Sequence, residues 1–150
     1  MCALRSCAWS TNKWASGGNN PVQNHPEFCH CGSATTPDNC CLRFIKGSKL
    51  PNTAEQLMRS RYSAFTLKDG PYLLATWHPT NRPSRIRFNE RQRWVGLAIR
   101  SIKNGATVNE SFVEFVARFK IDGKGHRLHE RSRFVREDNR WFYVDGEHFD

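Results

Sequence analysis

Long apolar runs and acidic side chains are both scarce in this chain of 150 residues. Its uninterrupted apolar stretches are only a few residues long, far short of the roughly 20 that cross a bilayer, so an integral membrane protein is excluded and no membrane partner is expected. A secretory signal, which needs an apolar core of about 7–15 residues, is disfavoured on the same ground. Acidic residues number 14 against 23 Lys and Arg, which leaves a formal charge of +9. Such a charge describes solubility and non-specific binding, and it does not by itself identify a partner.

The N-terminal segment contains no acidic residue before Glu27 and is rich in Ser, Thr and turn-forming residues. Residues 1–27 are therefore predicted to be a flexible leader, although a scarcity of acids is also typical of an organelle transit segment. The predicted location is the cytoplasm, with a plastid or a mitochondrion as the alternative if the leader is a transit segment. Cys2 and Cys7 lie in this leader and are expected to be unpaired thiols.

The main domain is predicted in residues 51–150, where the hydrophobic period changes once. Its first part has apolar residues spaced for one face of a helix, namely Ala54, Leu57, Met58, Tyr62 and Phe65. Thr53 and Gln56 have the spacing of a capping box at the start of this helix. A second, short helix is predicted from Gly70 to Trp77, because Pro79 disfavours helix in the residue before it.

Beyond the helices the hydrophobic period falls to two, and β-branched and aromatic residues become frequent. Four strands are predicted, over Arg93–Lys103, Ser111–Lys120, Arg127–Glu137 and Arg140–Asp145. Short turn sequences separate them, so neighbouring strands should be antiparallel. The sequence thus predicts an α+β domain in which the helices cover one face of an antiparallel sheet.

A cysteine-rich element is predicted in residues 28–50. Its cysteines are Cys29, Cys31, Cys40 and Cys41. Four thiolates fill the tetrahedral coordination of Zn²⁺ and leave no open position, so the predicted cofactor is a structural zinc ion. Two disulfides or free redox thiols are the alternatives, but adjacent Cys40 and Cys41 would need separate partners in a strained loop, which favours the metal. The run from Cys29 through Gly32 to Cys41 resembles the SEC-C motif, a small zinc-binding element.

Several phrases of the main domain resemble the YchJ family of uncharacterised proteins. They are Thr53–Phe65, Thr76–Pro79, Trp94–Leu97, Val113–Arg118, Leu128–Phe134 and Trp141–Gly146. The resemblance implies a nuclear-transport-factor-2-like fold, in which a curved antiparallel sheet wraps around helices to make a cone with a pocket. The helix and strand pattern agrees with this expectation. The activity of the family is not established, so the resemblance implies no particular reaction.

One carboxylate is predicted to face the interior of this cone. On the strand expected over Arg127–Glu137, the residues that share the apolar face are Leu128, Glu130, Ser132 and Phe134. A buried carboxylate is costly unless it is paired or functional, so an ion pair of Glu130 with Arg59 or Arg61 is favoured over a pocket role. The further pocket candidates are Arg61, Tyr62, Trp77 and His78. Of these, His78 is more simply explained as a structural histidine bonded to the backbone.

Positive charge is concentrated in residues 82–103, where seven Lys and Arg stand against one acid, Glu90. Arginines interleaved with aromatic residues such as Trp94 are typical of surfaces that bind phosphates and stack on bases. The basic-surface candidates are Arg85, Arg87, Arg91 and Arg93. The favoured alternative is a solvated face whose arginines pair with Glu114, Glu130 or Glu137, because arginines along a strand alternate between its faces.

The sequence contains no Ser–His–Asp order, phosphate loop or paired-carboxylate motif. The leading hypothesis is therefore a non-enzymatic binding or adaptor protein, whose zinc element supports a surface and whose cone holds a small ligand or a segment of a protein partner. The second hypothesis is an isomerase- or dehydratase-type enzyme that uses Glu130. The third is association with nucleic acid or the ribosome through residues 82–103.

Overall fold

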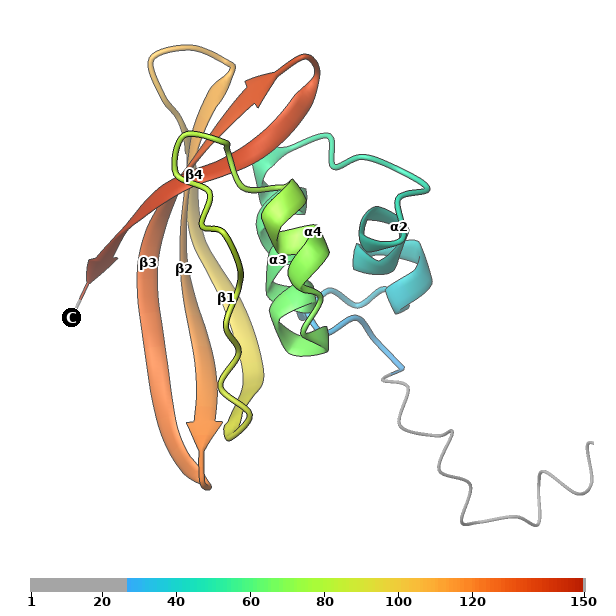
Figure 1. Ribbon diagram of the computed structural model, residues 1–150, viewed down its shortest axis with the longest axis vertical. Coiled ribbons are helices and arrows are strands. Elements are labelled where there is room, and N and C mark those ends of the chain that lie inside the picture. Colours follow the sequence, from blue (N-terminus) through green and yellow to red (C-terminus); the bar gives the residue numbers. More distant parts are fainter. Residues whose placement is uncertain (1–26, 150) are drawn as a thin grey trace, which may run out of the picture.

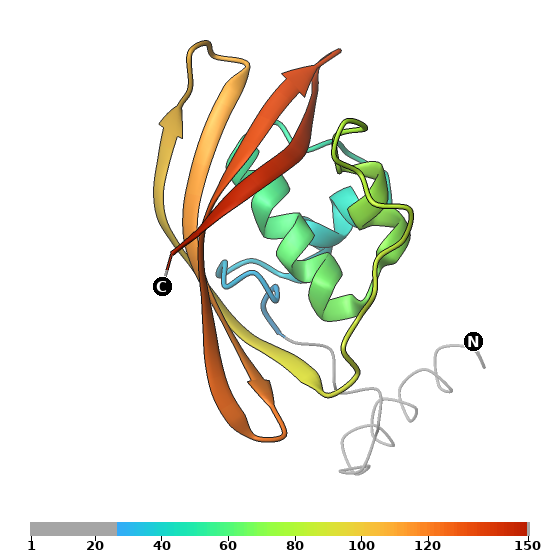
Figure 2. The ribbon, with the colours of Figure 1, turned by 60° about the vertical axis from the view of Figure 1, so that its left-hand side comes forward.

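The computed structural model describes residues 27–149, so the predictions for residues 1–26, including Cys2 and Cys7, lie outside it. Its elements are η2 (Pro37–Asn39), α2 (Cys41–Ile45), α3 (Ala54–Leu67), α4 (Gly70–Ala75), β1 (Gln92–Asn104), β2 (Glu110–Ile121), β3 (Lys124–Glu137) and β4 (Arg140–Phe149). The strands form one curved sheet, and the helices gather on one side of it (Figures 1 and 2). This is the α+β arrangement that the sequence predicts. Within the described part of the chain, no helix is long and apolar enough to cross a membrane.

The long helix α3 begins at the capping residues that the sequence indicates. Thr53 Oγ1 accepts a hydrogen bond of 3.1 Å from the backbone N–H of Gln56, and Gln56 Oε1 accepts one of 2.8 Å from the N–H of Asn52. These two bonds satisfy N–H groups that have no partner inside the first turn. The buried apolar residues of the helix are Ala54, Leu57, Met58, Tyr62 and Ala64. The stripe predicted from the sequence is therefore the face that packs on the sheet.

The short helix α4 ends two residues earlier than predicted. Asp69 caps its start by accepting a hydrogen bond from the N–H of Tyr72. After Ala75 the chain pairs with β4 instead of continuing the helix: Tyr143 donates its N–H to the Thr76 carbonyl at 2.9 Å, and His78 donates its N–H to the Tyr143 carbonyl at 2.7 Å. This pairing with a distant strand is a tertiary contact, so Pro79 alone could not place the end of the helix.

The sheet is an antiparallel meander in the order β1-β2-β3-β4. Two of its hairpins have two-residue turns, Asp122-Gly123 and Asp138-Asn139, and all four turn residues have positive φ angles, between 49° and 81°. Asn, Asp and Gly tolerate that left-handed backbone, which explains the turn signals in the sequence. The prediction that the last strand stops at Asp145 was wrong, because β4 keeps its pairing with β3 as far as Phe149 opposite His129.

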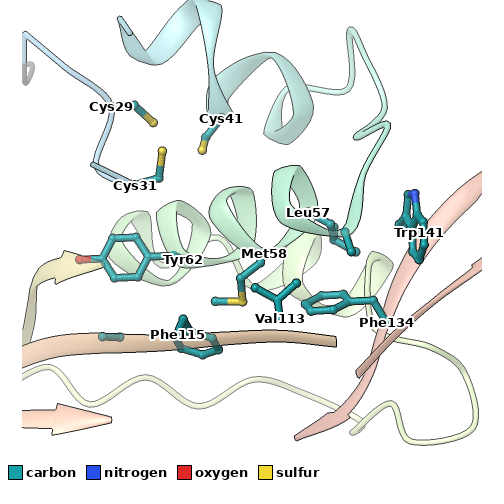
Figure 3. Packing of buried hydrophobic residues seen from close by; sticks show 12 residues of the cluster. Cys29, Cys31, Cys41, Leu57, Met58, Tyr62, Val113, Phe115, Phe134 and Trp141 are labelled. Atoms are coloured by element: carbon teal, nitrogen blue, oxygen red, sulfur yellow. The ribbon is translucent and has the colours of Figure 1, made fainter. Parts of the chain in front are cut away.

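The hydrophobic core lies between α3 and the concave face of the sheet. Figure 3 shows Met58 and Tyr62 of α3 facing Val113 and Phe115 of β2. The same buried cluster includes Cys29, Cys31 and Cys41, which lie on the other side of α3. The cysteine element and the main domain therefore share one core, while the domain boundaries expected from the sequence stay predictions.

Candidate metal centre and interior pocket

The four cysteines of the N-terminal element converge on one point. Their sulfur atoms all lie within 4.8 Å of one another, and all four are free thiols. The Cys31 and Cys40 sulfurs are 3.6 Å apart and those of Cys40 and Cys41 are 3.9 Å apart. Four sulfurs around Zn²⁺ at about 2.3 Å stand about 3.8 Å from each other, so this set fits a tetrahedral metal. No disulfide links these four residues, whose thiols are all free.

Local backbone geometry brings the two cysteine pairs together. Gly32 has a φ of 85°, a conformation that residues with a side chain rarely adopt, and this turns the chain directly after Cys31. The short helix η2 then reverses the chain, so that Cys40 and Cys41 arrive at the start of α2. The close approach of four thiols follows from this sharp double turn within thirteen residues.

Several contacts hold the cysteine cluster against α3. The Cys29 sulfur lies 3.6 Å from Ser63 Oγ, and Arg59 donates a hydrogen bond of 2.9 Å to the Cys31 carbonyl. The Ser33 hydroxyl lies 3.1 Å from the Cys40 sulfur. The close packing of the thiols also shifts their pKa values in opposite directions. Hydrogen bonds from Cys29 and Cys41 lower the pKa of Cys31, whereas hydrogen bonds to Cys29 and Cys31 raise the pKa of Cys41. Four thiolates at this spacing need a cation at their centre.

A second feature is an interior hollow of about 250 Å³ between α3 and the sheet. Its walls are formed by Met58, Arg61, Tyr62, Phe65, Trp77, Trp94, Phe115, Ala117, Leu128, Glu130, Ser132 and Tyr143. Four of the five pocket candidates from the sequence lie here, and the exception is His78. Most of the lining is aromatic or aliphatic, so the hollow is an apolar cup with a few polar groups. Phe65, Trp94 and Tyr143 also line the hollow but were not predicted to, because their positions in the sequence do not distinguish a pocket residue from a core residue.

Glu130 lies on the wall of this hollow and is 7% exposed. One of its oxygens accepts hydrogen bonds from Ser132 Oγ at 2.7 Å and from the Tyr143 hydroxyl at 3.4 Å, and the other lies 2.8 Å from Nε2 of His148. The predicted ion pair with Arg59 or Arg61 was therefore wrong. His148 was missed because it lies beyond the point at which the last strand was expected to end.

The two helical arginines have other partners. Arg59 pairs with Glu55 one turn earlier in α3. Arg61 is buried and donates hydrogen bonds to the Leu73 carbonyl at 2.8 Å and to Thr76 Oγ1 at 2.7 Å. Its guanidinium also lies over the ring of Tyr143, 4.6 Å from the ring centre. Burial lowers the pKa of Arg61 to about 10, so the side chain keeps its charge at neutral pH.

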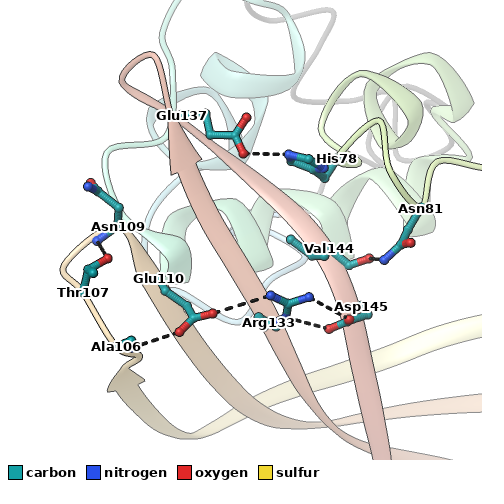
Figure 4. Close-up of polar contacts among 10 residues, drawn as sticks. All are labelled: His78, Asn81, Ala106, Thr107, Asn109, Glu110, Arg133, Glu137, Val144 and Asp145. Carbon is teal, nitrogen blue, oxygen red and sulfur yellow. Dashed lines mark hydrogen bonds and ion pairs between the residues drawn. The ribbon is translucent and has the colours of Figure 1, made fainter.

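His78, the remaining pocket candidate, lies outside the hollow. Its Nε2 is 2.7 Å from Glu137 (Figure 4). Its Nδ1 is 2.8 Å from Thr80 Oγ1. Nδ1 also accepts a hydrogen bond of 3.3 Å from the backbone N–H of Thr80, and the backbone N–H of His78 bonds to the main chain of β4. The ring is thus bonded to a backbone N–H, as favoured from the sequence, and in addition to the carboxylate of Glu137.

The arginines of the basic segment are exposed, as the solvated-face interpretation predicts, but the carboxylates expected to pair with them have other partners. The three carboxylates expected to pair with its arginines, Glu114, Glu130 and Glu137, all contact histidines instead. Of the basic-surface candidates, Arg91 pairs with Asp122 and Arg85 is exposed. Arg87 and Arg93 line a surface groove of about 440 Å³ next to the end of α3.

Comparisons with known proteins match the main domain and the SEC-C motif. The family described as "YchJ, middle NTF2-like domain" matches residues 53–146. The chain belongs to the YchJ family. A UPF0225 protein of Methylibium petroleiphilum is 52% identical over 129 residues, which cover 84% of this chain and 92% of the relative. A UPF0225 protein of Chromobacterium violaceum is 46% identical over 123 residues, which cover 79% and 90%.

Solved structures extend the similarity of this YchJ-family chain to the cysteine element. A solution structure of a SEC-C motif containing protein from Rhodopseudomonas palustris has a TM-score of 0.72 and 33% identity, covering 81% of this chain and 98% of that one. A crystal structure of a SEC-C motif containing protein from Psychrobacter arcticus has a TM-score of 0.63 and 27% identity, covering 84% and 77%. The fold and the motif predicted from the sequence are thereby confirmed. A four-cysteine cluster able to hold a metal ion accompanies them.

Proposed function

We propose that this YchJ-family chain is a small binding module in which a structural zinc ion fixes the cysteine element to α3, and the interior hollow receives a small, mainly apolar ligand or an apolar side chain of a protein partner. The observation that carries the proposal is the hollow itself, an apolar cup with a buried carboxylate at its wall. Ligand sites are typically concave and apolar with a few well-placed polar groups.

The cysteine cluster supports the structural half of this proposal. The four sulfurs lie close enough together to fill all four coordination positions of a zinc ion, which would leave no position for a substrate or a catalytic water. Three of the four cysteines are buried in the core that also holds Tyr62, a residue of the hollow. A metal ion at this point therefore stabilises the helix that forms one wall of the hollow.

Catalysis through Glu130 has less support than ligand binding. Both oxygens of its carboxylate already have partners, in Ser132, Tyr143 and His148. Among the residues lining the hollow, Glu130 is the sole carboxylate and no histidine is present. A proton-transfer reaction needs an acid or base that is free to face its substrate, and the hydrogen bonds of Glu130 engage it with the protein instead.

A binding assay with a neutral aromatic probe tests the proposed pocket. N-phenyl-1-naphthylamine has an apolar body and one N–H, which suits an apolar cup with a carboxylate at its wall. Ala117 lines the hollow, so Ala117→Leu should fill part of it and weaken probe binding about tenfold or more. The matched control is Ala106→Leu in the exposed loop before β2, which should bind like the wild type.

Native mass spectrometry of the full chain provides the second arm. We expect one zinc ion per chain, and loss of any co-purified small molecule in the Ala117→Leu protein. Equal probe affinity in the wild type and in a folded Ala117→Leu variant would refute the pocket. Absence of stoichiometric zinc from freshly purified protein would refute the structural metal, and it would leave the pocket result to be judged separately.

A further inference from the structure

A cluster of four cations lies on the outer face of the sheet, near the turn between β2 and β3. Its members are Arg93, Arg118, Lys120 and Arg127, all exposed. In the pairing register, Arg93 stands directly opposite Lys120, and Arg118 stands directly opposite Arg127. Strand alternation places all four on the face away from the core, because Trp94, Phe119 and Leu128 face inward. We refer to these four residues as the basic quartet.

The quartet has no counter-charge within the described residues. None of its four side chains makes a hydrogen bond or an ion pair there, and the nearby acids are engaged elsewhere, Asp122 with Arg91 and Glu114 with His129. Like charges directly opposite each other destabilise a sheet. Two such pairs side by side are therefore unfavourable in the isolated protein, and an anionic partner would remove the repulsion.

An aromatic groove adjoins the quartet. Arg93 belongs to both, since it also lines the groove of about 440 Å³ beside the end of α3. The aromatic residues of the groove are Phe65, Phe88 and Trp94. Arg87 is a second groove cation, after Arg93, that has no hydrogen-bond or ion-pair partner among residues 27–149. Lys68, also in the groove, is paired with Glu90. Cations beside partly exposed rings provide both phosphate contacts and stacking surfaces.

We propose that this surface binds single-stranded nucleic acid, with phosphates on the basic quartet and bases against the groove. A duplex is a poorer match, because aromatic side chains stack only on bases that are not already stacked in a helix. An acidic polypeptide would match the charge but would make no use of the three rings. The groove shares Phe65 and Trp94 with the wall of the interior hollow. Phe88 and the basic quartet line neither the hollow nor the cysteine cluster, so the proposal does not depend on the function proposed for them.

Fluorescence anisotropy with a labelled twelve-nucleotide oligouridylate tests the proposal on the full chain. Binding should weaken as salt rises, with a slope in a log–log plot of roughly 0.7 per phosphate contact on a single strand. Arg118→Gln combined with Arg127→Gln removes two contacts, so the slope should fall by about 1.4. The matched control, Lys46→Gln with Lys49→Gln, removes the same charge from exposed positions beside the cysteine element and should leave the slope unchanged.

Phe88→Ala separates stacking from charge. Phe88 lies in a coil segment and contacts Phe65 at the groove, so its removal should leave the fold intact. Affinity should fall by about fivefold or more while the salt slope stays as in the wild type, since stacking does not release counterions. Unchanged affinity in a folded Arg118→Gln, Arg127→Gln protein would overturn the proposal. Displacement of the oligonucleotide by an equal charge of poly-L-glutamate would also overturn it, in favour of an acidic protein partner.

Discussion

Gly146 shows how one missing side chain shapes the interior hollow. A Cβ atom at this position would lie 2.1 Å from Oε1 of Glu130. The glycine thus leaves room for the buried carboxylate to lie against β4, where Tyr143 and His148 of the same strand reach it. In the sequence, Gly146 looks like the start of a turn after Asp145. In the structure it is a strand residue whose role is to make space for a charge.

Gly146→Ala should therefore displace the Glu130 carboxylate and lower the free energy of unfolding by about 1–3 kcal/mol, because hydrogen bonds to a buried charge are lost. Urea unfolding measures this change. Gly125→Ala is the matched control, since a Cβ there meets no atom within 4 Å. In a Glu130→Ala background the substitution at 146 should cost much less. An equal cost in both backgrounds would show that the two residues are not coupled.

The contact between α3 and α4 depends on a partly buried pair of hydroxyl groups. Ser60 donates its hydroxyl to the Leu57 carbonyl at 2.8 Å, so at its 2.7 Å contact with Tyr72 the phenol is the donor. Burial raises the pKa of Tyr72 to about 12 from an ordinary value of 10.0. Neutral phenol is therefore the form that the packed helices favour.

This contact predicts an alkaline instability with a defined sign. Because the pKa is raised in the folded state, the stabilisation is complete below pH 10 and is lost as the pH rises towards 12. Tyr72→Phe should cost about 1 kcal/mol at neutral pH, through the lost hydrogen bond, and should reduce the fall in unfolding free energy between pH 10 and 12. Urea titrations across this interval measure both quantities. A variant whose stability falls as steeply as that of the wild type would contradict the assignment.

On the scale of the whole molecule, the cysteine cluster and the sheet are connected through α3. Cys29, Cys31 and Cys41 lie in the same buried cluster as Leu57, Tyr62 and Phe115. Gly32 also approaches the sheet, since a Cβ there would lie 3.4 Å from the Leu97 carbonyl of β1. The metal element is thus part of the folded core, and its loss should affect the rest of the chain.

Chelation of the metal should lower the melting temperature of the whole chain by about 10 °C or more, in one cooperative transition. Hydrogen exchange should show lost protection in residues 29–45 and also along α3. Cys40→Ser, at the least buried cysteine of the four, should reproduce the effect, whereas Ser48→Ala nearby should not. If α3 and the sheet kept full protection after chelation, the cluster would be a separate unit and the shared core would carry no coupling.

Local patterns in the sequence determined most of the secondary structure. The cap at Thr53, the apolar stripe of α3 and the Asp-Gly and Asp-Asn turns are short-range features, and the structure has them where the sequence indicates. The inward face of β3 was predictable for the same reason, because alternation along one strand needs no partner. Glu130 was therefore placed on the correct face from the sequence alone.

The predictions that failed concern features that are set by contacts between distant segments. The end of α4, the length of β4 and the His148 partner of Glu130 depend on pairing across the sheet. The basic quartet shows this most clearly: charges on one strand alternate between faces, yet the antiparallel register brings cations of three strands together on one face. The sequence by itself determined the cysteine set, the elements and the facing of each strand. The tertiary structure decided which charges meet, because register and packing place residues that are far apart in the chain side by side.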